Sequence, residues 1–170
     1  TTSPTTWIAK DPTRDKVLVW STQELSAIIG PENGSVPALW EVRVMSPYGT
    51  PAGRSVQLVN NNVWIWLVNS GTGSGFAMWD GGVTRIVYDP IKTSVGLIDW
   101  ANVGTKTASW LDEQGRYHCN VPKSSGYQEF IYDPKTQGWS VGVSKDIRAS
   151  GIVRISGRDY SLIGDEVGNQ

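Results

Sequence analysis

The stretch RSVQLVNNNVWIWLVNSGTGSGFAMWDGGVTRIVYD, residues 54–89, predicts four short strands joined by turns. Each predicted strand is rich in β-branched and aromatic residues and is bounded by turn-forming residues such as Asn, Gly and Asp. The strongest turn signal is Asp80-Gly81-Gly82, since glycine adopts positive φ without steric cost. The stretch therefore indicates an antiparallel meander. Its four strands are expected at residues 54–59, 63–68, 76–80 and 83–89.

The same order of strands and turns recurs on both sides of this stretch. Downstream, residues 107–144 contain TASWLD, RYHCNV, EFIYD and WSVGV. Upstream, residues 5–45 contain TTWIAK, KVLVW, LSAIIG and LWEVRV. A fourth copy begins with GIVRIS at residue 151, turns at 157–158, continues with DYSLIG and ends in DEVGNQ, where a third strand is due. In this scheme IVYDP belongs to a fourth strand and FIYDP to a third, so these two similar segments are not equivalent.

The spacing of the copies predicts the fold class. They begin roughly 40 to 50 residues apart, which is the spacing of β-propeller blades of four strands each. We therefore predict an all-β fold of antiparallel four-stranded meanders stacked as about three and a half propeller blades. Residues 1–170 are expected to form a single, partial β-propeller domain, part of a larger or multi-chain propeller. The expected blades span approximately residues 5–45, 54–90, 107–144 and 151–170, the last incomplete, with a longer connection at 90–106.

Two local patterns refine this prediction. Within the connection, the spacing of apolar residues over 91–103 favours a short helix, which Gly96 weakens. The predicted strand 63–68 carries apolar side chains on both faces, with Val, Ile and Leu on one and Trp, Trp and Val on the other. A strand that is apolar on both faces is expected between two neighbouring sheets, as in stacked blades.

Composition and charge argue against several classes of partner. Lys and Arg number 15 against 16 Asp and Glu, giving a formal charge of −1, so we expect no direct nucleic-acid binding. The single cysteine, Cys119, excludes an internal disulfide and a cysteine metal cluster. No apolar run approaches the ~20 residues needed to cross a bilayer, and no signal segment opens the chain, so no membrane contact is expected. Residue 1 is Thr instead of Met, which indicates processing, trimming or a partial sequence.

Signatures of catalysis are also missing from the sequence. No G-x-S-x-G elbow, H-E-x-x-H pair, P-loop or C-x-x-C pair occurs. The glycine-rich GTGSG at 71–75 is expected as a flexible loop, because it joins two strands instead of leading into a helix that would bind phosphate. His118 and Cys119 are neighbours in a predicted strand and point to opposite faces, so they do not form a base and nucleophile pair. We expect structural roles for both.

The aspartates at strand ends are the remaining catalytic candidates. A pair of them would suit glycoside hydrolysis, but each stands beside turn residues, where Asp ordinarily accepts backbone hydrogen bonds. Neither DEQG nor DEVGNQ has the alternating oxygen ligands of a calcium loop, and a bound calcium ion stays an open alternative. We therefore predict no enzymatic activity, no cofactor and no metal site. The aspartates concerned are Asp80, Asp89, Asp112 and Asp133.

The nine tryptophans are the main remaining candidates for a role in binding. Most lie within predicted strands, so at least six are expected in the core, where large side chains fill the space between blades. Trp100 and Trp139, near a loop and a turn, are expected to be partly exposed. With Tyr127 and Tyr160 they are the candidate interface or ligand residues, since exposed aromatic rings stack on sugars and anchor protein interfaces.

Several stretches resemble the β-propeller segments of bacteriophage tail and head-to-tail proteins, particularly hub or nozzle proteins of short tails. They are GRSVQLVNNNVWIW with FAMWDGGVTRI, GRYHCNVP with FIYDPKTQGWSV, and GRDYSLIGDEVGN. Residues 55–168 fit this pattern and the first fifty fit it less well; other propellers use the same hairpin chemistry. The chain departs from the family in its short length and incomplete last blade.

The resemblance implies a structural role in a virion, with no active site to carry over. Localisation would be the phage tail or neck, and the partners would be other virion proteins or copies of the same chain in a symmetric ring. Two other functions stay open. One is a glycan-binding propeller that uses aromatic residues of loops such as NSGTGSG and PKSSGYQ. The other is a hydrolase with carboxylates at blade edges.

Overall fold

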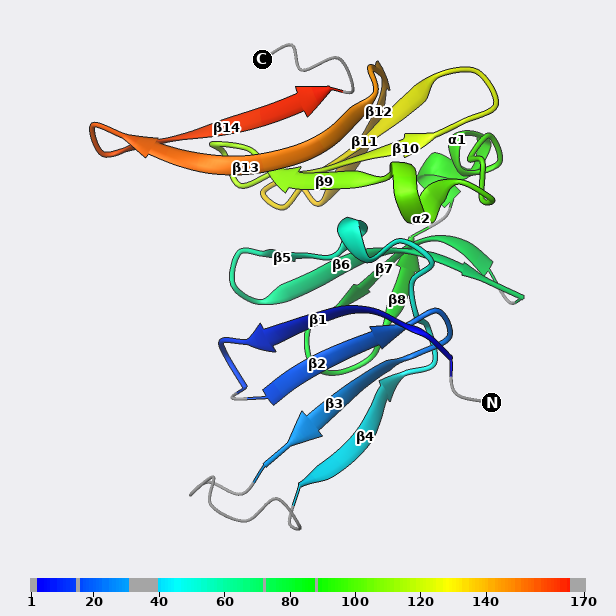
Figure 1. Cartoon of the computed structure of the whole chain (residues 1–170), viewed down its shortest axis with the longest axis vertical. Helices are drawn as coiled ribbons and strands as arrows, with labels where there is room; N and C mark the ends of the chain where they lie inside the picture. The colour runs from blue at the N-terminus through cyan, green and yellow to red at the C-terminus, as the bar shows by residue number, and fades with distance from the viewer. Residues whose placement is uncertain (1–2, 15, 31–39, 72, 88, 166–170) are drawn as a thin grey trace.

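The computed structural model describes residues 3–14, 16–30, 40–71, 73–87 and 89–165 (Figure 1). The described chain is all-β and contains four open antiparallel sheets of four, four, four and two strands. Within every sheet the strands follow one another in chain order, so each sheet is a meander. The predicted four-stranded meanders are confirmed three times, and the fourth copy is a two-stranded hairpin.

Every predicted strand is present, but some bounds differ. Strands at 57–59 and 85–87 are shorter than those expected at 54–59 and 83–89, the strand expected at 39–44 lies at 41–46, and the strand expected at 151–156 begins at 147. The first sheet contains β1 (Thr5–Asp11), β2 (Lys16–Ser21), β3 (Leu25–Ile29) and β4 (Glu41–Ser46). The second contains β5 (Gln57–Val59), β6 (Val63–Ser70), β7 (Gly73–Trp79) and β8 (Arg85–Val87). The third contains β9 (Ala108–Leu111), β10 (Tyr117–Pro122), β11 (Tyr127–Asp133) and β12 (Gly138–Ser144). The hairpin consists of β13 (Ile147–Ile155) and β14 (Arg158–Asp165).

Some boundaries differ from those expected. The glycine-rich segment, expected as a flexible loop, contributes Gly73, Ser74 and Gly75 to β7, and Ser70 pairs with Gly73. Residues Gly53–Ser55 form a 3-10 turn before β5. The turn of the last hairpin is Ser156-Gly157, both with positive φ, one residue earlier than expected. The expected loop at 31–38, and the segment where the fourth copy's third strand is due, lie outside the described residues.

The expected helix over 91–103 is replaced by two single-turn helices. A 3-10 turn (Asp89–Ile91) leads into α1 (Lys92–Val95), and α2 (Val103–Lys106) follows after a bend. Gly96 caps α1, and Ile98 forms a β-bridge with Lys123, so the backbone leaves the helical path between them. The apolar residues of this segment are nevertheless buried together in one core cluster, which includes Ile91, Val95, Ile98 and Val103.

The sheets pack face to face in the order of the chain (Figure 1), and β6 lies at the centre of this packing. Its residues Trp64, Trp66 and Val68 belong to the core between the first and second sheets. Ile65 and Leu67 belong to the core between the second and third sheets. The expectation that β6 is apolar on both faces because it lies between two sheets is therefore confirmed.

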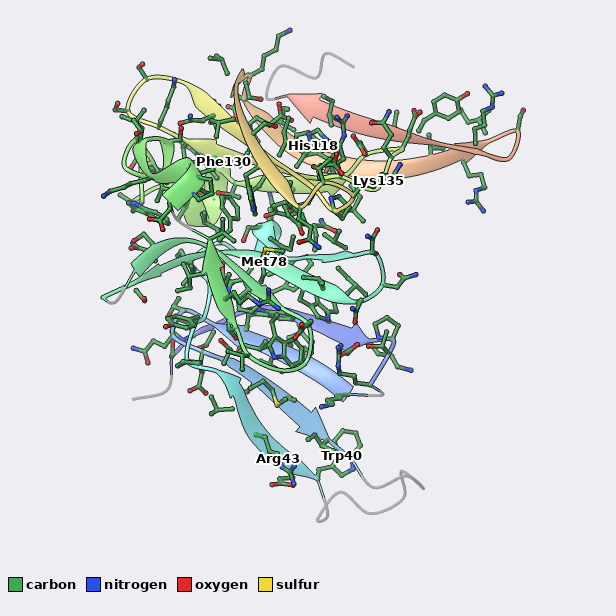
Figure 2. All side chains as sticks on the ribbon, turned by 180° about the vertical axis from the view of Figure 1, so that it is seen from behind. Trp40, Arg43, Met78, His118, Phe130 and Lys135 are labelled. Carbon is green, nitrogen blue, oxygen red and sulfur yellow. The ribbon has the colours of Figure 1, made fainter. Side chains whose placement is uncertain are left out.

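Large aromatic side chains fill both cores. In the first core, the ring of Trp20 lies 5.2 Å from that of Trp64 and 5.9 Å from that of Trp66. Nε1 of Trp66 donates a hydrogen bond of 3.1 Å to the carbonyl oxygen of Gly49, which satisfies the buried indole. In the second core, the ring of Phe76 lies 5.1 Å from that of Phe130. Figure 2 shows Met78 on the side of the second sheet that faces the third.

The first strands of the four sheets meet along one line, which we call the inner seam (Thr6, Gly53, Arg54, Gln57, Ser109 and Ser150). Ser109 is its centre: its hydroxyl donates to the carbonyl of Arg54 at 2.6 Å, and its carbonyl accepts from Gln57 at 3.1 Å and from Ser150 at 2.8 Å. A cavity of about 330 Å³ follows the seam and is lined by residues of β1, β5, β9 and β13. Hydrogen bonds therefore join the second sheet, the third sheet and the hairpin along the seam, and the first sheet approaches the second closely where Thr6 meets Gly53. Apolar cores lie behind this line.

Gly53 sets the distance between the first and second sheets at the inner seam. A Cβ at residue 53 would overlap the backbone carbonyl of Thr6, which cannot move away as a flexible side chain can. We expect Gly53→Ala to lower the free energy of unfolding by about 2 to 3 kcal/mol, as overpacking of a closed contact does. Urea unfolding followed by tryptophan fluorescence measures this change.

Gly71→Ala is the matched control, because a Cβ at residue 71 has no neighbouring atom within 4 Å. Its free energy of unfolding should stay within about 0.5 kcal/mol of the unmodified chain. Equal stabilities for the two variants would contradict the close contact at the seam.

Candidate functional site

The four aromatic residues predicted as interface or ligand candidates lie at separate places in the structure. Trp100 is half-buried between α1 and α2, and Trp139 is half-buried on β12. Tyr127 is half-buried at the start of β11, and Tyr160 is exposed on β14. The partial exposure expected for Trp100 and Trp139 is confirmed. The structure does not bring the four residues into one site, and their role in binding stays a prediction.

Most other tryptophans are core residues, as expected, but two are more exposed than the candidates Trp100 and Trp139. Trp7 is 39% exposed and Trp40 is 48% exposed, and both belong to the first sheet or its border. Trp7 lines the cavity at the inner seam, and Trp40 lies just before β4. Neither exposure was visible in the sequence, because a tryptophan in or beside a strand looks the same whether or not other segments cover it. Figure 2 shows Trp40 and Arg43 at the end of the molecule formed by the first sheet. The buried set numbers five, one below the expected minimum of six: Trp20, Trp64, Trp66, Trp79 and Trp110.

Trp139 lines a groove of about 410 Å³ between the second and third sheets, which we call the Trp139 groove. The ring of Trp139 lies 5.2 Å from that of Tyr132 and 4.8 Å from that of Phe76, so one side of the groove is aromatic and firmly packed. Polar groups come from the hairpin turns at its rim. The full lining is Val63, Met78, Asp80, Val83, Arg85, Val87, Pro90, Tyr132, Gln137 and Trp139.

Trp100 lines a different groove, of about 790 Å³, near the β6–β7 turn. Tyr48, Ser74, Thr84 and Asp89 are among its neighbours there. Trp100 and Trp139 both pack against the same core cluster from opposite grooves. The two tryptophans therefore pack on the same core but line separate grooves, so a single small ligand does not contact both.

His118 is the centre of a charged cluster on the face of the third sheet beside the hairpin β13–β14 (Figure 2). Its Nδ1 lies 2.8 Å from Oε1 of Glu129, and its Nε2 lies 3.1 Å from Oδ2 of Asp112. The imidazole stacks on the indole of Trp110 at 5.1 Å, and Trp110 packs with Ile147 of β13. An imidazolium donates to both carboxylates at once, which a neutral ring does not.

The environment of His118 favours its charged form. Burial by itself lowers the pKa of the imidazole, but the hydrogen bonds and charges of Glu129 and Asp112 outweigh burial and raise it above 6.5. Burial likewise opposes ionisation of Asp112, while hydrogen bonds from Arg116, His118 and Gln114 outweigh it and lower the pKa of that carboxyl. The cluster thus stabilises an ion pair at an edge of the core.

Cys119 lies on the opposite face of β10 from His118, as the strand pattern predicts. It is fully buried in the second core, and burial raises the pKa of its thiol to about 12. The thiol therefore stays protonated at neutral pH and is a packing group. His118 and Cys119 do not form a catalytic pair in this geometry.

The predicted turn role of the strand-end aspartates is visible at three of the four positions. The carboxylate of Asp80 accepts from the backbone N–H of Gly82, that of Asp112 from Gln114, and that of Asp133 from Lys135, at 2.8 to 3.1 Å. Asp112 additionally binds His118, which the sequence did not indicate because Asp112 follows β9 and His118 lies in β10. No group of three or more His, Cys, Asp and Glu side chains suited to a metal ion occurs among the described residues.

Comparison with protein-family models gives no match for this chain, and comparison with curated proteins gives none either. Within the described part of the chain, no helix has the length and apolar character that a membrane span requires.

The His118 cluster makes stability depend on pH in a defined direction. The pKa of His118 in the folded state is raised above its unfolded value of about 6.5. Protonated His118 therefore stabilises the folded state fully below pH 6.5, and this stabilisation is lost as the pH rises through the folded-state pKa. Because the chain has one histidine, proton NMR of the His118 ring should report this pKa directly, and the melting temperature should fall over the same pH range.

Replacing the partner carboxylate tests the cause. Glu129→Gln should lower the pKa of His118 relative to the unmodified chain and reduce the pH dependence of the melting temperature. Glu113→Gln, which removes an exposed carboxylate in the adjoining turn, should leave both unchanged. A His118 pKa at or below 6.5 in the unmodified chain would show that the carboxylates do not hold the proton.

Proposed function

We propose that this chain is a structural, non-enzymatic protein of a bacteriophage virion that builds a propeller-like domain in the tail or head-to-tail assembly. The observation that carries the proposal is the repeated packing of meander sheets face to face with their first strands along one seam. Sheets arranged around a shared line of first strands are the units of a β-propeller. On this proposal, the three four-stranded sheets are complete blades and the two-stranded hairpin is half of a fourth.

The ends of the stack support a role in assembly. Several large aliphatic side chains of the first sheet and of the hairpin are more than half exposed. Contiguous exposed apolar surface of this kind in a folded chain marks contact with another protein. On this proposal, function resides in the rigid sheets and the surfaces that they present, with no chemical step.

The virion setting is supported by the resemblance of residues 55–168 to propeller segments of phage tail proteins. The hairpin stretches that carry this resemblance occupy equivalent positions in the second and third sheets, as FAMWDGGVTRI spans β7 to β8 and FIYDPKTQGWSV spans β11 to β12. Repeated hairpin chemistry at equivalent positions is what a blade repeat requires.

Labelling of particles tests the virion role. Gold-conjugated antibodies against the purified chain should label the tail or neck of particles of the phage that encodes it, as seen by electron microscopy. Heads and tail fibres serve as internal controls. Particles that carry no label after gentle opening of the tail would contradict the proposal.

A second candidate function, glycan binding, is favoured by the Trp139 groove. An aromatic wall beside carboxylate, guanidinium and amide groups suits a sugar, whose apolar face stacks while its hydroxyls form hydrogen bonds. Asp80, Arg85, Gln137 and Trp139 supply these groups. Trp139 itself is held by Tyr132, so the wall is preformed.

Glycan binding predicts a specific signal on a glycan array and a change in tryptophan fluorescence on titration with the glycan identified. Arg85→Gln should weaken that binding at least tenfold, since the side chain is 80% exposed at the rim and its replacement leaves the core intact. Arg158→Gln, on the distant hairpin β13–β14, is the control. A flat array and a flat titration would reject this second candidate.

A further inference from the structure

The outer face of the first sheet is largely apolar, with Lys10 and Ser26 as its polar members in the two rows described next. Pairing across the sheet aligns Ile8 with Val19, Ser26 and Val44 in one row, and Lys10 with Val17, Ile28 and Val42 in the next. Directly paired residues share a face, and this face is opposite to Leu18, Trp20 and Ala27, which enter the first core. We call it the sheet end: Ile8, Val17, Val19, Ile28, Val42 and Val44.

No sheet of the described chain covers the sheet end, which lies at the opposite end of the stack from the hairpin (Figure 1). Ile8, Val42 and Val44 are each about 60 to 70% exposed. Equivalent side chains of β6, in the middle of the stack, are fully buried on both faces. The sheet end therefore has the composition of a packed sheet face without the sheet that would pack on it.

The other end of the stack carries a second apolar surface. In the hairpin β13–β14, Val153 pairs with Tyr160, Gly151 with Leu162, and Ile155 with Arg158, which puts Val153, Ile155, Tyr160 and Leu162 on one face. The opposite face carries Ser150, whose hydroxyl binds the third sheet at Ser109. We call the outward face the hairpin end. Ile155 and Leu162 are each just over half exposed.

From these two surfaces we infer that the hairpin end of one copy of this chain packs on the sheet end of a second copy, head to tail. The inference rests on the proposed function and names the partner and the surfaces through which the chain assembles. One contact buries both apolar surfaces. A symmetric contact between two identical ends would bury only one kind and leave the other exposed.

The packing within the chain is the reason to choose a second copy as the occupant. The first sheet packs on the second and the second on the third, each time through aliphatic and aromatic side chains on facing sheets. A second copy placed beyond the hairpin repeats this step and continues the existing order of sheets. The contact is heterologous, so it closes into a ring if the rotation per copy divides a full turn and otherwise extends into a filament.

Paired charge variants test this arrangement by sedimentation velocity over a range of concentrations. The sheet-end variant carries Val42→Lys and Val44→Lys, and the hairpin-end variant carries Ile155→Lys and Leu162→Lys. The unmodified chain should form oligomers, while each variant alone should need at least a tenfold higher concentration to associate. An equimolar mixture of the two variants should form a one-to-one dimer, because the mixture retains one intact end of each kind.

The control variant carries Leu97→Lys and Val143→Lys, two aliphatic residues that are 50% and 88% exposed and lie on neither end. It should associate as the unmodified chain does. If the lysine variants fail to fold, as judged by circular dichroism, uncharged polar replacements of similar shape take their place. These are Val42→Thr with Val44→Thr at the sheet end and Leu162→Asn at the hairpin end, and a smaller loss of association is expected.

Three outcomes would overturn the inference. They are an unmodified chain that is monomeric at all concentrations, a hairpin-end variant that still dimerises through its sheet end, and a mixture of variants that stays monomeric. Monomers in solution together with labelled phage tails would reject self-association while the virion role stands. Oligomers in solution with unlabelled particles would reject the virion role while the head-to-tail contact stands.

Discussion

Burial of both faces of β6 is the constraint on which the rest of the structure depends. Its tryptophans fill the core against the first sheet, and its isoleucine and leucine fill the core against the third. Because successive side chains of a strand alternate, a slip of one residue in its pairing would exchange these two sets. The bulky indoles would then enter a core shaped around Phe76 and Phe130. The register of β6 therefore determines how three sheets fit together.

The inner seam adds a second constraint of a different chemical kind. Its contacts join small or polar side chains to backbone carbonyls, with Ser109 linking three segments that are distant in sequence. Small side chains let first strands approach closely, and Gly53 makes the closest approach, to Thr6. Apolar contacts place little constraint on the relative orientation of two sheets, whereas a hydrogen bond requires a defined direction between donor and acceptor. The seam thus orients sheets that the cores hold together.

Because of these two constraints, the surfaces available for binding lie at the ends of the stack and at the turns. Within the described chain the second sheet is packed on both faces, so grooves between outer strands and the terminal surfaces are available for binding. The Trp139 groove and the two apolar ends are of this kind. The His118 cluster is different, since it lies where the hairpin meets the third sheet and stabilises that junction through charge. A scaffold of packed sheets of this kind is consistent with the proposed structural role.

The sequence by itself determined the strands, their order and their turns, because alternation, β-branched and aromatic content and Asp-Gly chemistry act over a few neighbouring residues. It also determined that β6 is covered on both sides and that His118 and Cys119 point apart. Four features depended on tertiary structure: the break of the expected helix at Gly96, the pairing of His118 with Asp112 and Glu129, the exposure of Trp7 and Trp40, and the seam at Ser109. Each of these depends on which distant segments become neighbours, and an apolar residue in a strand carries no sign of whether a partner sheet covers it.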